Sequence, residues 1–265
     1  MIEKFKKYFF VIAGPCVIEN ENICMEVAET LNDISKKLGI HYIFKASFDK
    51  ANRSSVDSFR GIGFEKGLDV LSKIKNKYNF QVTTDVHETY QIRQVAKVVD
   101  IIQIPAFLCR QTDLLVEAGK TGKIINVKKG QFLSGYDMRN VILKIESTGN
   151  KNIILTERGN SFGYNNLIVD MRNILIMKRF GYPVVFDATH SVQIPGGMGS
   201  CSGGEREFVY PLAKASVAAG ANGVFMEVHP EPEKALCDGP NSVELKNVEK
   251  IILNLSKLYD LVNNR

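Results

Sequence analysis

Eight short apolar runs alternate with eight helix-like segments along the 265 residues of the chain. Most of the runs are rich in Val, Ile and Phe and do not alternate with polar residues, which is typical of parallel strands covered on both faces. The runs are Tyr8–Gly14, Tyr42–Ser47, Gln81–Val86, Asp100–Ile104, Lys123–Val127, Asn152–Thr156, Pro183–Asp187 and Gly223–Val228. The helix-like segments are Glu21–Leu38, Glu65–Tyr78, Glu88–Val98, Gln111–Ala118, Asp137–Ser147, Asn166–Phe180, Glu205–Ala219 and Val243–Leu261. This repeated order predicts an α/β fold, a (β/α)8 TIM barrel, with residues 1–265 as a single domain.

An open, doubly wound sheet is the alternative arrangement of such elements. Its commonest signature is G-x-G-x-x-G directly after the first strand. Here the first run continues as A-G-P-C-V-I-E, which lacks that pattern. The closed barrel is therefore favoured.

The first apolar run admits two interpretations. Lysines precede the stretch Tyr8–Ile18, and the A-G-P-C segment that ends at Cys16 could be the small-residue site of a cleavable export signal. Pro15 directly before Cys16 and Glu19 shortly after it disfavour cleavage, and the count of eight strands needs this run as the first strand. The chain has five cysteines, an odd number, and no C-x-x-C pair, so we expect reduced thiols and a cytoplasmic location.

The charge balance narrows the range of partners. The chain carries 34 basic and 29 acidic residues, a formal net charge of +5, without a long Lys/Arg block. We therefore expect small anionic ligands and no nucleic acid. No apolar stretch reaches the roughly 20 residues of a membrane helix, so we expect no membrane partner.

Charged residues follow the strands at the point where barrel enzymes carry their chemistry, the carboxyl ends. The cationic ones are Lys45, Lys50, Arg53, Arg110, Lys128 and Arg158. Any one of them alone would be ordinary solvated surface charge. Lys45, Lys128 and Arg158, however, directly adjoin apolar runs, where the barrel lumen would be. This cluster predicts a ligand with more than one anionic group.

A second set combines a thiol, an imidazole and carboxylates. Cys16 follows the first strand, His190 the seventh and Glu227 the eighth, with Asp238 in the next loop. Because the eighth strand of a closed barrel neighbours the first, these side chains would share one edge of the mouth. Such donors suit a divalent transition metal ion such as Zn²⁺, Fe²⁺ or Mn²⁺. From spacing alone, a core cysteine and a hydrogen-bonded loop histidine are favoured over a metal site.

The glycine-rich segment Gly196–Gly204 follows the seventh strand and precedes a segment with helical spacing that begins at Glu205. It lacks the G-K-[S/T] ending of a phosphate-binding P-loop. A helix N-terminus facing an anion is conceivable here, and a flexible lid is the favoured interpretation.

Long motifs over most of the chain resemble one enzyme family. They are A-G-P-C-V-I-E, F-K-A-S-F-D-K-A-N-R-S-S, T-D-V-H-E, I-Q-I-P-A-F-L-C-R-Q-T-D-L-L, N-V-K-K-G-Q-F, T-E-R-G-N-S-F-G-Y-N-N-L-I-V-D-M-R, F-D-A-T-H-S-V-Q and M-E-V-H-P-E-P-E-K-A-L-C-D-G-P-N. These motifs, from about Phe9 to Asn241, are similar to those of the 3-deoxy-D-manno-octulosonate 8-phosphate synthases, also called 2-dehydro-3-deoxyphosphooctonate aldolases. The resemblance implies condensation of phosphoenolpyruvate with D-arabinose 5-phosphate and release of inorganic phosphate, in the biosynthesis of the lipopolysaccharide core sugar Kdo.

The same resemblance implies roles for individual residues. It places Lys50, Lys128 and Arg158 around phosphoenolpyruvate, with Lys45 and Gln103 nearby. It places Asn52, Arg53 and Ser54 on the pentose phosphate, Asp85 towards the sugar, and Arg110 in reach of that phosphate from a neighbouring subunit of a homotetramer. Cys16 stands where metal-dependent members carry Cys and metal-independent members carry Asn, so it implies a divalent metal ion held by Cys16, His190, Glu227 and Asp238. The resemblance implies catalytic roles for Lys50, Lys128, His190 and Asp238.

Two alternatives remain open at this point. One is the related condensing enzyme that uses erythrose 4-phosphate, in which K-P-R-T-S typically stands at the place of K-A-N-R-S-S. The other is a barrel that binds sugar phosphates without turnover. The presence of Lys128, Arg158, His190 and Glu227 together favours an enzyme over the second alternative.

Overall fold

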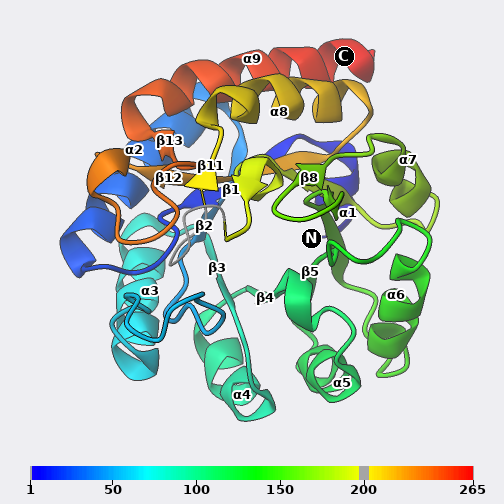
Figure 1. Ribbon diagram of the computed structural model, residues 1–265, viewed down its shortest axis with the longest axis horizontal. Helices are drawn as coiled ribbons and strands as arrows, with labels where there is room; N and C mark the ends of the chain where they lie inside the picture. The colour runs from blue at the N-terminus through cyan, green and yellow to red at the C-terminus, as the bar shows by residue number, and fades with distance from the viewer. Residues whose placement is uncertain (1, 197–202, 265) are drawn as a thin grey trace.

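The computed structural model describes residues 2–196 and 203–264, and its centre is a closed barrel of parallel strands (Figure 1). In their order around the barrel the strands are β1 (Phe10–Gly14), β2 (His41–Lys45), β3 (Gln81–Asp85), β4 (Ile101–Ile104), β5 (Ile124–Lys128), β6 (Ile153–Glu157), β9 (Val184–Asp187) and β12 (Gly223–His229). Pairing of β12 with β1, from Phe10 opposite Gly223 to Gly14 opposite Glu227, closes the ring. The predicted eight-stranded barrel is confirmed, and the open sheet is excluded.

Helices surround the barrel on its outside. They are α2 (Glu21–Leu38), α3 (Phe64–Tyr78), α4 (Thr89–Val98), α5 (Thr112–Lys120), α6 (Met138–Glu146), α7 (Arg172–Lys178), α8 (Val209–Ala218) and α9 (Val248–Val262). Helix α2 shows how local sequence sets such bounds: the Asn20 side chain accepts a hydrogen bond from the Ile23 amide at its start, and Gly39 adopts a left-handed conformation at its end. None of the helices in the described part of the chain is both long and apolar enough to cross a bilayer.

Three of the expected helices, α7, α8 and α9, begin several residues later than their apolar pattern predicts. The segment expected from Asn166 instead forms a hairpin of β7 (Asn160–Ser161) and β8 (Leu167–Ile168) before α7. Its turn is fixed by the hydrogen bond from the Phe162 amide to the Asn166 carbonyl. The segment expected from Glu205 has a 3-10 turn, Arg206–Phe208, before α8. The segment expected from Val243 starts with β13 (Val243–Glu244), in which Val243 pairs with Val228, and a 3-10 turn then leads into α9. Tertiary pairing at the mouth of the barrel overrides helical spacing in these loops.

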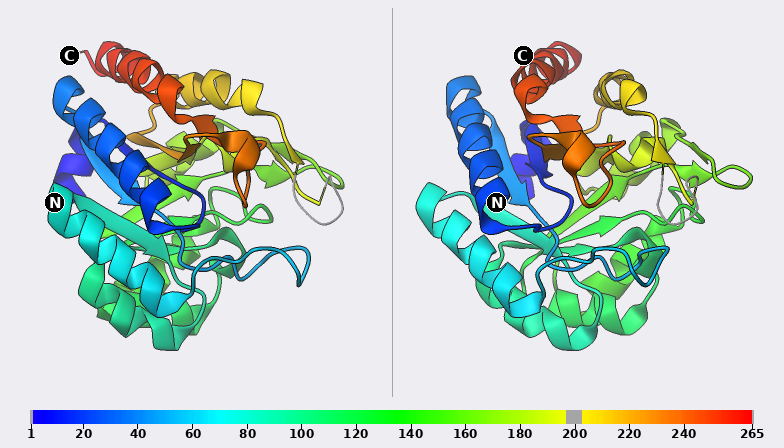
Figure 2. Two further views of the ribbon diagram at one scale, coloured as in Figure 1. Left: turned by 90° about the vertical axis from the view of Figure 1, so that its left-hand side faces the viewer. Right: turned by 60° about the vertical axis from the view of Figure 1, so that its left-hand side comes forward.

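The chain enters the barrel through a short helix, α1 (Ile2–Lys7), that sequence patterning did not predict. Figure 2 shows α1 at one end of the barrel and the loop between β2 and α3 projecting from the other. The Phe5 side chain is buried against Phe10, with ring centroids 4.5 Å apart. It belongs to the apolar cluster inside the barrel, which comprises Phe5, Phe10, Ile12, Ile43, Ile101, Ile124, Ile154, Val185 and Phe225. Helix α1 therefore covers the amino-terminal end of the barrel with a hydrophobic plug.

The plug gives a prediction for stability. Replacing Phe5 with Ala removes a fully buried ring, so the free energy of unfolding should fall by about 3–5 kcal/mol. Chemical denaturation followed by circular dichroism measures this change. Phe162→Ala is the matched control because that ring is 67% exposed, and it should change stability by less than about 1 kcal/mol. Equal effects of the two substitutions would show that Phe5 does not contribute to the core.

Candidate active site

A cavity of about 440 Å³ opens at the carboxyl ends of the barrel strands, opposite α1. Nine of the ten residues expected to bind substrate line it: Lys45, Lys50, Asn52, Arg53, Ser54, Asp85, Gln103, Lys128 and Arg158. Two of the expected metal ligands, His190 and Asp238, also line it. The tenth residue, Arg110, is exposed outside the cavity, where its carbonyl oxygen accepts a hydrogen bond from Lys144.

Four cationic side chains are buried at the floor of this cavity, namely Lys45, Lys50, Lys128 and Arg158. The Lys45 ammonium contacts the Cys16 carbonyl at 3.1 Å and the Ser47 hydroxyl at 2.6 Å. It also lies 3.7 Å from Glu227, whose carboxylate is 3.4 Å from Lys50. Burial alone would raise the pKa of Glu227, but His190 and Lys50 outweigh it and hold that pKa well below its usual range. The floor therefore holds a carboxylate that stays ionised among cations.

Lys128 and His190 share one carboxylate, that of Asp187. The Lys128 ammonium donates to Asp187 Oδ2 at 2.5 Å and lies 3.5 Å from the centre of the Phe225 ring. The His190 ring contacts the same oxygen through Nδ1 at 2.7 Å, and the His190 amide donates to the other oxygen at 3.0 Å. Burial lowers the pKa of Lys128, although Asp187 opposes the shift. Asp187 thus fixes the imidazole orientation and leaves Nε2 facing the remaining carboxylates.

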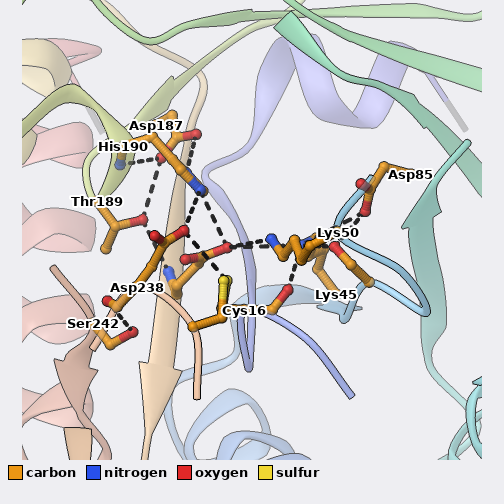
Figure 3. A network of polar contacts seen from close by, with 12 residues as sticks. Cys16, Lys45, Lys50, Asp85, Asp187, Thr189, His190, Asp238 and Ser242 are labelled. Atoms are coloured by element: carbon orange, nitrogen blue, oxygen red, sulfur yellow. Dashed lines mark hydrogen bonds and ion pairs between the residues drawn. The ribbon is translucent and has the colours of Figure 1, made fainter. Parts of the chain in front are cut away.

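The expected metal ligands meet in two overlapping groups. His190 Nε2 lies 3.3 Å from Glu227 Oε1 and 3.7 Å from Asp238 Oδ2. Cys16 Sγ lies 3.4 Å from Asp238 Oδ2, and Figure 3 shows Cys16, His190 and Asp238 converging on one region. These separations match the edges of a tetrahedron with bonds of about 2.0–2.3 Å to a central ion. The donor set therefore fits a divalent metal ion.

Several buried polar atoms around the cavity have no hydrogen-bond partner within the described residues. They are Arg53 Nε, Gln103 Oε1, Arg158 Nη1 and Glu227 Oε2. Burying an unpaired polar group costs about 1–3 kcal/mol. Such a cluster is typical of a site whose remaining partners come from a bound molecule.

The family model described as "DAHP synthetase I family" matches residues 5–264. The chain belongs to this family. It is 58% identical over 247 residues to the 2-dehydro-3-deoxyphosphooctonate aldolase of Fusobacterium nucleatum, covering 93% of this chain and 89% of that protein. Proteins of the same name from Geobacter sp. strain M21 and Francisella tularensis subsp. holarctica are 59% and 55% identical, over 96% and 98% of this chain and 93% and 94% of theirs. The family resemblance read from the motifs is confirmed.

Sequence reasoning missed residues that this member of the DAHP synthetase I family places in its site. In the sequence, Asp187 is only the last residue of an apolar run, and its spacing of three residues from His190 in F-D-A-T-H is the signal that could reveal its role. Cys237 also lines the cavity, and its sulfur atom lies 2.9 Å from that of Cys16. Its position directly before the predicted ligand Asp238 is the signal that could reveal it. The glycine-rich segment expected to be a lid falls largely on residues 197–202, which lie outside the described residues.

The second lysine of the N-V-K-K-G motif, Lys129, has a different environment from Lys128. Its fully buried ammonium lies 3.5 Å from Glu157 and donates to the Leu133 carbonyl and to Asn160, both at 3.0 Å. Burial lowers the pKa of Lys129 and raises that of Glu157, and the attraction between the two opposes both shifts. Lys129 thus ties the β5 loop to the β6 loop that carries Arg158.

Removing Lys129 should destabilise the protein in a pH-dependent manner. Lys129→Met leaves the Glu157 carboxylate buried without a cation, so the free energy of unfolding should fall by about 3–5 kcal/mol near neutral pH. The substitution raises the folded-state pKa of Glu157 further above its unfolded value. A raised carboxyl pKa makes the folded state lose stability as the pH rises, so the deficit should be larger at pH 8 than at pH 5. Denaturant titrations of variant and parent at both pH values measure it.

The double variant Lys129→Met/Glu157→Gln serves as the control for this prediction. Because it removes both charges, it should recover about 0.5–3 kcal/mol relative to the sum of the single substitutions and lose the pH dependence. Strict additivity of the two substitutions would contradict the pairing.

Proposed function

We propose that this chain condenses phosphoenolpyruvate with D-arabinose 5-phosphate and water, giving 3-deoxy-D-manno-octulosonate 8-phosphate and inorganic phosphate in lipopolysaccharide core biosynthesis. It would thus be a transferase of the 3-deoxy-8-phosphooctulonate synthase type. The observation that carries the proposal is the cluster of four buried cations under a cavity with a further cation, Arg53, on its wall. Two phosphates and a carboxylate are the anions that such a cavity suits. The names of the relatives support the same reaction.

Phosphoenolpyruvate would bind at the cavity floor. Arg158 supports this placement because its Nη2 is held by Gln193 at 3.0 Å while its buried Nη1 is unpartnered among the described residues. A guanidinium fixed on one side can hold a carboxylate or phosphate oxygen on the other. Lys50 and Lys128, with Lys45 and Gln103 beside them, would complete the binding of this substrate.

The pentose phosphate would bind along the loop that follows β2, where Asn52, Arg53 and Ser54 line the cavity. Asp85 would accept hydrogen bonds from the sugar hydroxyls. Burial opposes its ionisation, but Lys45 and His87 outweigh it and hold the pKa of Asp85 well below its usual range. It would therefore remain an acceptor at neutral pH.

Cys16, His190, Glu227 and Asp238 would hold a divalent metal ion, whose identity we leave as Zn²⁺, Fe²⁺, Mn²⁺ or a similar ion. When bound, it would supply Lewis acidity towards an aldehyde or water oxygen and help to orient the substrates. The Nδ1 contact with Asp187 supports the role of His190, because ligating histidines ordinarily donate their other nitrogen to a carboxylate or carbonyl.

The chain's own residues would promote the reaction by positioning and charge. Holding both substrates face to face removes much of the entropic barrier to attack by C3 of phosphoenolpyruvate on the aldehyde carbon. Lys50 would stabilise the negative charge that develops on the aldehyde oxygen. Water adds to C2, and the Asp238 carboxylate would take the proton that this water loses, while His190, with Nδ1 held by Asp187, would help to position that carboxylate. Lys128, whose pKa burial lowers, would donate a proton as the tetrahedral intermediate expels phosphate.

The quaternary state and location belong to the same proposal. Arg110 is exposed and does not line its own cavity, which agrees with a role at the phosphate site of a neighbouring subunit in a homotetramer. We propose a cytoplasmic enzyme whose partners are its two small-molecule substrates.

Substrate specificity is tested by phosphate release. With phosphoenolpyruvate present, D-arabinose 5-phosphate should support turnover, and erythrose 4-phosphate should support at least about 100-fold less, because the loop that follows β2 carries K-A-N-R-S-S. Preference for erythrose 4-phosphate would assign the chain to the other condensing reaction. Absence of release with either sugar, in protein loaded with Zn²⁺ or Mn²⁺, would assign it a binding role.

Metal dependence is tested at Cys16. Cys16→Ala should lower metal affinity by about 100-fold or more and abolish turnover with it, because it removes a buried donor. Metal content after dialysis and phosphate release measure the two losses in one preparation. Cys24→Ala, a buried thiol on α2, is the matched control and should retain both. Full turnover of chelated parent protein would contradict the metal proposal.

A further inference from the structure

Two cysteine side chains face one another beside the Asp238 carboxylate. Cys16 follows β1 and Cys237 lies in the loop after β12, yet their sulfur atoms are 2.9 Å apart and both side chains are buried. The reaction proposed above uses only the first of them. The second is therefore a metal-binding group without an assigned role.

The possible metal-ligand atoms at this site form two groups, and their membership favours a metal-binding role for Cys237. In residues 2–196 and 203–264, the metal-ligand candidates of this region form two groups whose atoms lie within 4.8 Å of one another. One group is His190, Glu227 and Asp238, and the other is Cys16, Cys237 and Asp238. Asp238 belongs to both. An ion bound by Cys16 in this geometry would meet Cys237 before it meets His190.

The local backbone is built to present Cys237 and Asp238 together. Asp238 adopts a left-handed conformation with φ of 50°, which is uncommon for a residue other than glycine. Its carbonyl oxygen accepts hydrogen bonds from the Asn241 and Ser242 amides, both at 3.1 Å. A Cβ atom at Gly239 would come within 2.4 Å of the Pro232 carbonyl oxygen, so the turn is tightly packed. The Leu236 amide also donates to Glu19 at 2.9 Å, which ties this loop to the segment after Cys16.

The geometry around Cys237 permits ligation by its sulfur atom. Arg53 Nη1 lies 2.9 Å from Cys237 Sγ, so this sulfur faces a cationic group that also lines the cavity. In a tetrahedral site with metal–sulfur bonds of about 2.3 Å, two thiolates lie about 3.8 Å apart and a thiolate and carboxylate oxygen about 3.5 Å. The sulfur atoms would separate by roughly 1 Å to reach this geometry. The distance of 3.4 Å between Cys16 and Asp238 already fits it.

We propose that Cys237 is an additional metal ligand, so that Cys16, Cys237 and Asp238 bind a thiophilic divalent cation such as Zn²⁺ or Cd²⁺ through two thiolates. This inference rests on the metal centre of the proposed function and deepens it. Two soft donors favour such cations over Mn²⁺ and Mg²⁺, which prefer oxygen ligands.

Cobalt substitution counts the thiolates directly. The chelated, full-length protein is saturated with Co²⁺ under a reducing agent without thiols, and the near-ultraviolet thiolate-to-cobalt absorption is measured per bound ion. Because each thiolate contributes to this band, Cys237→Ser should halve it. Cys16→Ser should halve it as well, and the double variant should lose it. Cys24→Ser is the matched control and should leave it unchanged.

Each outcome of this experiment has a defined meaning. Full intensity in Cys237→Ser would overturn the inference. If Cys16→Ser then loses the band, Cys16 is the thiolate ligand, and the four-ligand centre of the proposed function stands. Absence of the band in the parent protein would overturn both. Metal competition supplies a second readout: Cys237→Ser should weaken Cd²⁺ binding by about tenfold or more and change Mn²⁺ binding much less. Equal effects on the two ions would contradict a thiolate role for Cys237. Circular dichroism verifies that each variant is folded.

Discussion

Closure of the barrel by the pairing of β12 with β1 is the contact on which the candidate site depends. Its register sets Gly14 opposite Glu227, so the segment that ends in Cys16 lies beside the strand that carries the carboxylate. On its other side β1 approaches β2 closely, because a Cβ atom at Gly14 would lie 2.0 Å from the Lys45 carbonyl oxygen. Residues more than 200 positions apart, such as Cys16 and Asp238, therefore reach 3.4 Å through backbone pairing.

The electrostatics of the cavity floor follow from this enclosure. Desolvating a charge costs several kcal/mol, and nearby opposite charges repay this only with good geometry. Asp85, Asp187 and Glu227 supply such neighbours to Lys45, Lys128 and Lys50. Arg158 is different, since its described polar contact is with an uncharged glutamine. In the proposed function, an anionic ligand would supply the hydrogen-bond partner that the buried Nη1 of Arg158 lacks among the described residues.

Prediction from sequence succeeded where one local pattern controls the outcome. Buried parallel strands are continuous apolar runs, so each of the eight barrel strands begins and ends within a few residues of its predicted run. It failed where distant contacts decide. Helix α1 is too short to show a pattern and is held by the barrel interior through Phe5. Strand exits indicated the cavity residues, but the closeness of Cys237 to Cys16 depends on a left-handed turn at Asp238 that sequence spacing does not encode.

The two adjacent lysines at the end of β5 have different environments because of strand geometry: Lys128 lines the cavity, and Lys129 forms an ion pair with Glu157. Successive side chains of a strand point to opposite faces, so Lys128 enters the barrel and Lys129 turns away from it. The same alternation operates at the end of β6, where Arg158 lines the cavity and Glu157 does not. Lys129 and Glu157 consequently meet each other outside the cavity at 3.5 Å. The ends of these two neighbouring strands thus supply two cations to the cavity, Lys128 and Arg158. The residues next to them, Lys129 and Glu157, form the ion pair that joins the two loops.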